Sequence, residues 1–157
     1  MKELIELLTI NKKTISTMES CTGGGVVNSI TNIEGASEVL KFSAVTYSNE
    51  YKIKMGVSKS VIDKYSVYST ETAMEMSKTI SNYANSDYGV GITGKLNRVD
   101  INNLHGKDNV VYISIYDRNN NNNKFYNTKI EVLKESRELN KQLVIDEVVN
   151  QMLKICK

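Results

Sequence analysis

The spacing of apolar residues along the chain predicts helices at both ends and in the middle. A helix over residues 2–10 is predicted by the helical spacing of Leu4, Ile5, Leu7 and Leu8. Further helices are predicted over residues 23–31, in short segments after Ser48 and Ser58, from Ser69 onward, and over residues 135–155. The helix after Ser69 should turn one face to the core, with Ala73, Met76, Ile80 and Tyr83 on it. The closing helix should bury Leu139, Leu143, Val144, Val148, Met152 and Ile155.

Runs of β-branched and aromatic residues predict the strands. They cover residues 14–18, 42–48, 88–94, 109–116 and 124–132. The last two flank a run of asparagines at positions 119–123 and predict an antiparallel hairpin across it. Residues 32–37 and 95–108 are predicted to be loops.

This mixture of elements predicts one domain over residues 1–157, built as a three-layer α/β/α sandwich with a mixed sheet. In such sheets ligands bind beyond the carboxyl ends of the strands. Ser20, Tyr47 and Thr93 all fall at or near predicted strand ends. They are therefore expected to meet at one edge of the sheet.

Composition excludes several classes of protein. Hydrophobic residues make up 40% of the chain and charged residues 24%, which is typical of a globular domain. A net charge of +2 is too small to indicate a nucleic-acid partner. Acidic residues interrupt the apolar N-terminal pattern, and no apolar run is long enough to span a bilayer, so we expect no signal peptide and no membrane partner. The two cysteines, Cys21 and Cys156, form neither a disulfide framework nor a metal motif, so we expect free thiols, a cytoplasmic location and no metal.

The most informative segment runs from Thr17 to Gly25 and joins the first predicted strand to the next helix. Its glycines allow a tight turn, and the first N–H groups of the helix favour an anion. Ser20 is a candidate nucleophile there, with backbone N–H groups of Thr22 to Gly25 to hold an oxyanion or a phosphate. The alternative is that Ser20 is merely a small residue at a tight turn.

A serine nucleophile needs a base, and the sequence leaves several open. The single histidine, His105, lies in a polar irregular segment and is typical of a solvated loop residue. A lysine base is the other known solution. Lys52 and Lys54 are equally good candidates on local pattern, and Tyr47 could relay a proton or orient the base.

The neighbours of Ser20 also have two interpretations each. Cys21 could be an alternative nucleophile, but adjacent side chains of an extended turn diverge, so it is interpreted as a small buried residue. Glu19 could bind a partner base or cap nearby N–H groups. Neither a Gly-x-Gly-x-x-Gly motif nor a Gly-Lys-Ser/Thr loop is present, which argues against dinucleotide and nucleoside triphosphate folds.

Two motifs together resemble a known family. They are Glu19-Ser-Cys-Thr-Gly-Gly24 and Val45-Thr-Tyr-Ser-Asn-Glu50, and the likeness continues through Lys52, Gly56-Val57, Val67-Tyr-Ser69 and Gly91-Ile-Thr-Gly94. This combination is similar to the carboxy-terminal domain of the competence/damage-inducible protein CinA. The stand-alone members of that family are nicotinamide mononucleotide deamidases. The likeness covers most of the chain.

The resemblance implies an α/β sandwich, a homo-oligomer and an amidohydrolase that converts nicotinamide mononucleotide and water to nicotinate mononucleotide and ammonia. It implies no cofactor and no metal. The family's catalytic serine, tyrosine and lysine match Ser20, Tyr47 and Lys52. The substrate-binding positions implied are Thr22, Gly23, Gly24, Thr93 and Gly94.

One segment departs from the family pattern. The family continues after Thr-Gly with a glycine-rich loop that lines the pocket, whereas Gly94 is followed here by Lys95-Leu-Asn-Arg-Val-Asp100. Lys95 and Arg98 could supply charge to a phosphate where the family uses backbone N–H groups. The loss of this loop motivates an alternative, in which the chain is a diverged accessory protein that binds a nucleotide without turning it over.

Overall fold

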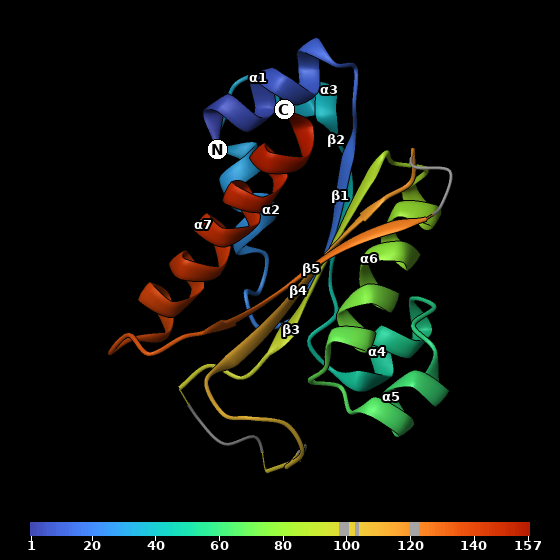
Figure 1. The fold of residues 1–157 in the computed structure, drawn as a ribbon, viewed down its shortest axis with the longest axis vertical. Coiled ribbons are helices and arrows are strands. Elements are labelled where there is room, and N and C mark those ends of the chain that lie inside the picture. Colours follow the sequence, from blue (N-terminus) through green and yellow to red (C-terminus); the bar gives the residue numbers. More distant parts are fainter. Residues whose placement is uncertain (98–100, 103, 120–122) are drawn as a thin grey trace.

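The computed structural model describes residues 1–97, 101–102, 104–119 and 123–157. Its centre is a five-stranded sheet in the order β2-β1-β3-β4-β5 (Figure 1). The strands are β1 (Ile15–Glu19), β2 (Leu40–Val45), β3 (Tyr88–Gly94), β4 (Val110–Asp117) and β5 (Lys124–Glu131). β1 runs parallel to both β2 and β3, while β4 and β5 form an antiparallel hairpin that continues the sheet from β3. The predicted mixed sheet is confirmed.

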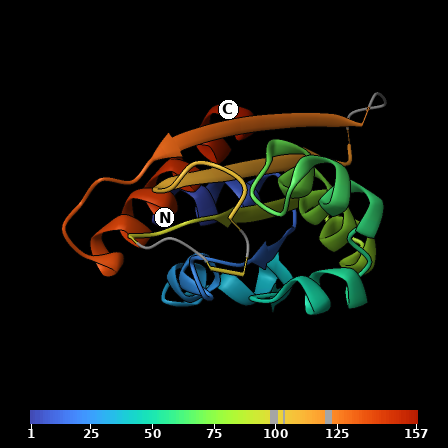
Figure 2. The same cartoon turned by 90° about the horizontal axis from the view of Figure 1, so that it is seen from below.

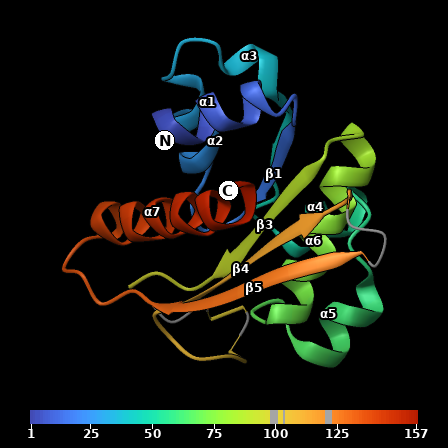
Figure 3. The ribbon, with the colours of Figure 1, turned by 45° about the horizontal axis from the view of Figure 1, so that its top comes forward.

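Helices cover both faces of this sheet and complete the predicted sandwich (Figures 1 and 3). One face carries α1 (Lys2–Ile10), α2 (Gly25–Thr31), α3 (Ala36–Val39) and α7 (Arg137–Cys156). The other carries α4 (Asn49–Lys54), α5 (Lys59–Tyr65) and α6 (Thr70–Ala84). In the part of the chain that the structure describes, no helix is both long and apolar enough to cross a membrane.

Several boundaries differ from the sequence prediction. α2 begins at Gly25 rather than at residue 23, because Gly23 and Gly24 have φ values of +61° and +92°, which a right-handed helix does not allow. The segment 32–37, predicted as a loop, contains the start of α3. β2 ends at Val45, opposite Glu19 at the end of β1, so the residues predicted to extend that strand to 48 lie in the connection to α4.

Two residues predicted for the core are exposed instead. Tyr83 is 66% exposed at the end of α6 and packs against the Phe42 ring, with 5.2 Å between ring centroids. Leu139 is 45% exposed in the first turn of α7. The neighbouring Asn140 is buried in its place, where it accepts from the Lys134 N–H and donates to the Asn97 side chain. The first turn of α7 therefore buries the Asn140 amide, which binds the chain at Lys134 and at Asn97. The helical spacing of apolar residues does not predict a buried amide.

Close approach between α6 and β3 depends on glycine in the middle of β3. A Cβ atom added at Gly91 would lie 2.2 Å from the Ala73 carbonyl oxygen and 2.5 Å from the Ser77 nitrogen, both backbone atoms of α6. Gly89, one pleat earlier, has a similar constraint, with the Ser77 carbonyl oxygen 1.9 Å away. Because the added atom would meet helix backbone, relief requires moving the whole of α6 away from the sheet.

We therefore expect Gly91→Ala to lower the free energy of unfolding by about 2 kcal/mol or more. Gly25→Ala is the matched control, since its added Cβ would meet the flexible end of Ile145 and alanine favours helix over glycine. The control should change stability by less than about 1 kcal/mol. Urea unfolding measures both, and equal effects would contradict this account of the packing.

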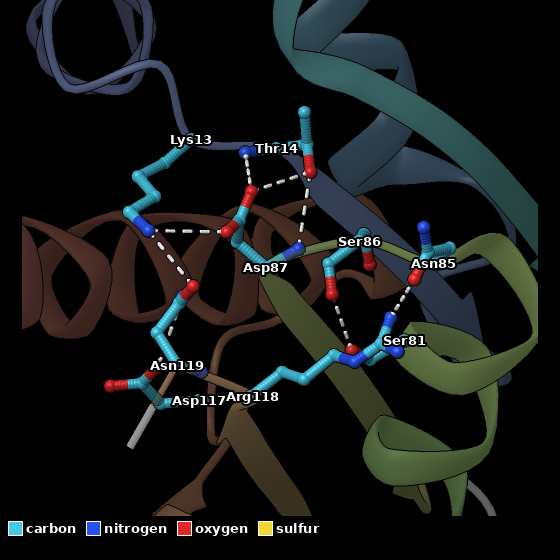
Figure 4. A network of polar contacts seen from close by, with 9 residues as sticks. All are labelled: Lys13, Thr14, Ser81, Asn85, Ser86, Asp87, Asp117, Arg118 and Asn119. Atoms are coloured by element: carbon cyan, nitrogen blue, oxygen red, sulfur yellow. Dashed lines mark hydrogen bonds and ion pairs between the residues drawn. The ribbon is translucent and has the colours of Figure 1, made fainter. Parts of the chain in front are cut away.

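Where β1 and β3 begin, a polar network joins the two strands at the end of the sheet opposite to their carboxyl ends (Figure 4). The Asp87 carboxylate accepts from the Thr14 N–H and hydroxyl, both at 2.8 Å, and from Lys13 Nζ at 3.2 Å. Partial burial acts to raise the pKa of Asp87, but the hydrogen bonds from Thr14 and the Lys13 charge outweigh it, so the pKa lies below its ordinary value.

This shift predicts a pH dependence of stability. Because the folded pKa is depressed, the contribution of Asp87 is complete above about pH 4, the ordinary aspartate pKa, and is lost as the pH falls through the lower folded value. At pH 7 we expect Asp87→Asn to cost about 1–3 kcal/mol, and below pH 4 its difference from the wild type should shrink. Urea unfolding between pH 3 and 7 tests this, with the exposed Asp63→Asn as control; a difference independent of pH would contradict it.

Candidate active site

A cavity of about 530 Å³ opens at the carboxyl ends of β1 and β3, the end of the sheet that Figure 2 faces. Its lining comes from six separate stretches of the chain: Ser20, Cys21, Tyr47, Ser48, Asn49, Lys52, Val67, Tyr68, Gly94, Lys95, Leu96, Asn102 and Arg137. Among the described residues no group of three or more metal-ligating side chains is present. The side chains that line the cavity carry hydroxyl, thiol, amide, amine and guanidinium groups.

Ser20 lies directly after β1, where the chain leaves the sheet. Its N–H donates to the Ile92 carbonyl oxygen at 3.1 Å, so the backbone here is still paired with β3. Only 6% of the residue is exposed. Its hydroxyl oxygen accepts a hydrogen bond from Lys52 Nζ at 3.0 Å.

Lys52 reaches Ser20 from the middle of α4. Ser48 caps this helix by accepting from the Tyr51 N–H. The Lys52 side chain is buried, with the residue 1% exposed, and Nζ also donates to the Thr46 carbonyl oxygen at 2.7 Å. Lys54 lies on the outer face of the same helix, paired with Glu50 in solvent. The structure thereby separates two lysines that local pattern left equal.

The other candidate base, His105, lines a different cavity. His105 is exposed and lines a neighbouring cavity of about 400 Å³, together with Asp63 and Ser66. It is not among the described residues that line the cavity with Ser20. The structure thus brings Lys52, and not His105, to the serine.

Tyr47 lies at the rim of the cavity and is 65% exposed. Its hydroxyl accepts from an Arg137 guanidinium nitrogen at 3.4 Å. Another nitrogen of the same guanidinium donates to the Leu96 carbonyl oxygen. Arg137 therefore joins the connection after β2 to the segment after β3.

The glycine turn holds a protein carboxylate. The Glu19 side chain is fully buried and accepts from the N–H groups of Gly24, Val26 and Val27 at 2.9–3.1 Å and from the Thr22 hydroxyl at 2.6 Å. Of the two sequence interpretations of Glu19, the capping role is confirmed. The N–H groups of Gly24, Val26 and Val27 are consequently occupied, so the expectation that this part of the turn presents free donors to an anion is corrected.

The predicted substrate-binding residues divide into two groups. Gly94 lines the cavity, whereas Thr22, Gly23, Gly24 and Thr93 are outside its described lining. The Thr93 hydroxyl is buried and donates to the Val67 carbonyl oxygen at 2.9 Å, so it fastens β3 to the segment before α6. A strand-end position and the family motif were the sequence signals for Thr93, and neither specifies which way the hydroxyl turns.

Cys21 lines the cavity but is a poor nucleophile. Burial raises the pKa of its thiol to about 12, more than the Lys52 charge lowers it. Its interpretation as a small buried residue is confirmed.

Sequence reasoning missed Arg137 as a lining residue and left Lys95 as a speculation. Arg137 is separated from Tyr47 by 90 positions, and an arginine at the start of a helix carries no local signal of a pocket. Lys95 did have a signal, since a charged residue replaces the family's glycine-rich loop, and the structure places it in the cavity wall. Arg98, its proposed companion, lies outside the described residues.

Comparison with known proteins is consistent with this architecture along the whole chain. The family model of the CinA C-terminal domain matches residues 1–156. A crystal structure of a CinA superfamily protein from Klebsiella pneumoniae superimposes with a TM-score of 0.89 at 17% identity, covering 99% of this chain and 94% of that one. A corresponding Escherichia coli structure gives a TM-score of 0.87 at 21% identity, covering 98% and 87%. At these identities the superpositions describe the fold alone.

Curated relatives match a shorter stretch at higher identity. A putative competence-damage inducible protein from Thermoanaerobacter pseudethanolicus is 46% identical over 92 residues, and a CinA-like protein from Kosmotoga olearia is 45% identical over 92 residues. Each match covers 58% of this chain and 22% of the relative. The chain thus corresponds to a minor part of the length of these relatives.

The Glu19 cap predicts a large effect from a small change. In Glu19→Gln an amide NH₂ would face backbone N–H groups that now donate to a carboxylate oxygen, so we expect a loss of about 2–3 kcal/mol in the free energy of unfolding. The exposed Glu34→Gln is the control and should stay within about 0.5 kcal/mol of the wild type. Chemical denaturation compares them, and a stable Glu19→Gln protein would disprove the structural importance of the cap.

Proposed function

Because the chain belongs to the CinA C-terminal domain family, we propose that it is an amidohydrolase that converts nicotinamide mononucleotide and water to nicotinate mononucleotide and ammonia. The observation that carries this proposal is the 3.0 Å contact between Lys52 Nζ and the Ser20 hydroxyl oxygen. A nucleophile and a base within hydrogen-bond distance are the minimum that serine-dependent amide hydrolysis requires.

Burial of Lys52 supports its role as the base. A lysine can accept a proton only as the neutral amine, and removal from water disfavours the charged form. The Thr46 carbonyl oxygen fixes the position of Nζ beside Ser20. Thr46 is itself tied to the first strand, since its N–H donates to the Glu19 carbonyl oxygen at 2.8 Å. The base and the nucleophile are thus held by the same pair of strands.

In the proposed reaction, the Ser20 oxygen attacks the carboxamide carbon while Lys52 accepts the hydroxyl proton. Lys52 then returns that proton to the nitrogen as the C–N bond breaks, which releases ammonia and leaves an ester on Ser20. A water molecule attacks the ester, gives a proton to Lys52, and the returning proton restores the serine hydroxyl. Tyr47 lies at the rim, where its hydroxyl, held by Arg137, assists in orienting the substrate or the base.

The developing oxyanion needs donors that the Glu19 carboxylate does not use. The N–H group of Cys21 directly follows Ser20, Cys21 lines the cavity, and within the described residues this N–H does not donate to a backbone carbonyl or to Glu19. We assign the oxyanion to it, because a donor that follows the nucleophile is already oriented before the reaction begins. The family resemblance carries further parts of the proposal, namely a role in pyridine nucleotide salvage, a cytoplasmic location and a homo-oligomer.

A second function is favoured by the segment after β3. Lys95 lies in the cavity wall at the point where the family has a glycine-rich loop, and its ammonium is paired with Asp108. This chain therefore lacks the glycine backbone with which the family lines the pocket. A protein with that change could bind a mononucleotide without hydrolysing it, as an accessory protein would. Ligand-induced thermal stabilisation without release of ammonia would favour this second function over the first.

Incubation of the purified protein with nicotinamide mononucleotide should release ammonia, measured by a coupled assay. Ser20→Ala and Lys52→Met should each lower kcat/KM about a thousandfold or more, because each removes half of the pair. Lys54→Met is the matched control from the same helix and should retain activity. Wild-type protein that releases no ammonia, or a Lys54→Met protein as inactive as Lys52→Met, would refute the proposed reaction.

A further inference from the structure

The charged side chains among the described residues of the cavity wall are all cationic. Three cationic side chains, Lys52, Lys95 and Arg137, are among the residues that line it, and none of the described lining residues is an aspartate or a glutamate. Lys52 contacts Ser20, whereas Lys95 and Arg137 contact other groups. A concave surface with positive charge and no carboxylate favours a negatively charged ligand.

Lys95 and Arg137 are neighbours on this wall. Arg137 donates to the carbonyl oxygen of Leu96, the residue that follows Lys95. The Lys95 backbone is in turn fixed by its own N–H, which donates to the Val110 carbonyl oxygen at 3.1 Å. The Lys95 backbone is therefore paired with β4 just beyond the end of β3, and Arg137 contacts the residue next to it.

The surroundings of the Lys95 ammonium are looser than those of a purely structural ion pair. Its side chain is 1% exposed, yet its polar contacts with described residues are long: 3.3 Å to Asp108, 3.4 Å to the Gly106 carbonyl oxygen and 3.5 Å to the Leu104 carbonyl oxygen. The Asp108 carboxylate is 48% exposed, so water competes for it. A ligand anion inside the cavity would offer the ammonium a partner screened from water.

We propose that Lys95 is the residue that selects a ligand carrying a phosphate, by moving its ammonium from Asp108 to the phosphate with Arg137 beside it. This rests on the proposed function only for the identity of the ligand, because the charge argument holds for any phosphate monoester that fits the cavity. Tyr68, whose ring centroid lies 5.2 Å from Lys95 Nζ, stabilises the ammonium by a cation–π contact during the exchange.

The test compares ligands that differ only in a phosphate. Calorimetry measures the binding of nicotinamide mononucleotide against nicotinamide riboside, and of adenosine monophosphate against adenosine, with Ser20→Ala protein so that no ligand is consumed. Lys95→Met should weaken binding of each monophosphate about ten- to one-hundredfold and leave each nucleoside unchanged. Lys95→Arg, which keeps the charge, should restore most of the preference.

Two variants control for other effects. Lys64→Met removes an exposed lysine on α5 and should change no binding constant. Asp108→Asn removes the competing carboxylate and should preserve or strengthen monophosphate binding. If Lys95→Met does not fold, Lys95→Gln takes its place.

The outcomes separate this inference from the proposed reaction. Equal weakening of nucleosides and monophosphates by Lys95→Met, loss of monophosphate binding in Asp108→Asn, or failure of the Ser20→Ala parent protein to bind any monophosphate would overturn the role of Lys95. A Lys95-dependent preference for the monophosphates supports it, even if the wild-type protein releases no ammonia. In that case the hydrolase proposal falls and phosphate selection stands.

Discussion

A single buried carboxylate determines how the first strand passes into the second helix. Glu19 satisfies the first N–H groups of α2 from inside the protein, and this contact curves the glycine turn around its side chain. The conformation of this glycine turn fixes the point at Ser20 where the chain leaves the sheet. A buried carboxylate is costly unless every oxygen is well paired, so the five donors that surround it, including the hydroxyls of Thr17 and Thr22, form one cooperative unit. The nucleophile position depends on this unit without Glu19 entering the cavity.

The two ends of the parallel strands use polar groups for different purposes. At their amino ends, Asp87 accepts hydrogen bonds from Thr14 and Lys13, so the polar atoms there join β1 to β3. At their carboxyl ends, polar atoms line a cavity. This division follows from the parallel arrangement, because the turns after neighbouring parallel strands meet at one edge and leave a crevice.

The side chains that line the cavity also include two pairs with different places in the fold: Ser20 with Lys52, and Lys95 with Arg137. Ser20 directly follows β1 and Lys52 comes from α4, the helix after β2, and they are held closely by short hydrogen bonds. Lys95 directly follows β3, in the segment that departs from the family pattern, and Arg137 begins α7. The pair that would perform chemistry thus lies in the half of the site that matches the family pattern, and the altered segment bears on which ligand enters.

The sequence by itself determined most of the order of the elements, the mixed sheet and Ser20 as the candidate nucleophile, because periodicity and glycine placement are local properties that each segment carries alone. Local pattern did not separate Lys52 from Lys54, and only the family resemblance implied Lys52. The two lysines are two positions apart and so face different sides of α4, and packing of that helix on the sheet turns Lys52 inward. Nor did the sequence decide that Thr93 would bind Val67, or that Arg137 would meet Tyr47. Those contacts join residues that are distant in the chain, and their partners exist only once the layers have come together.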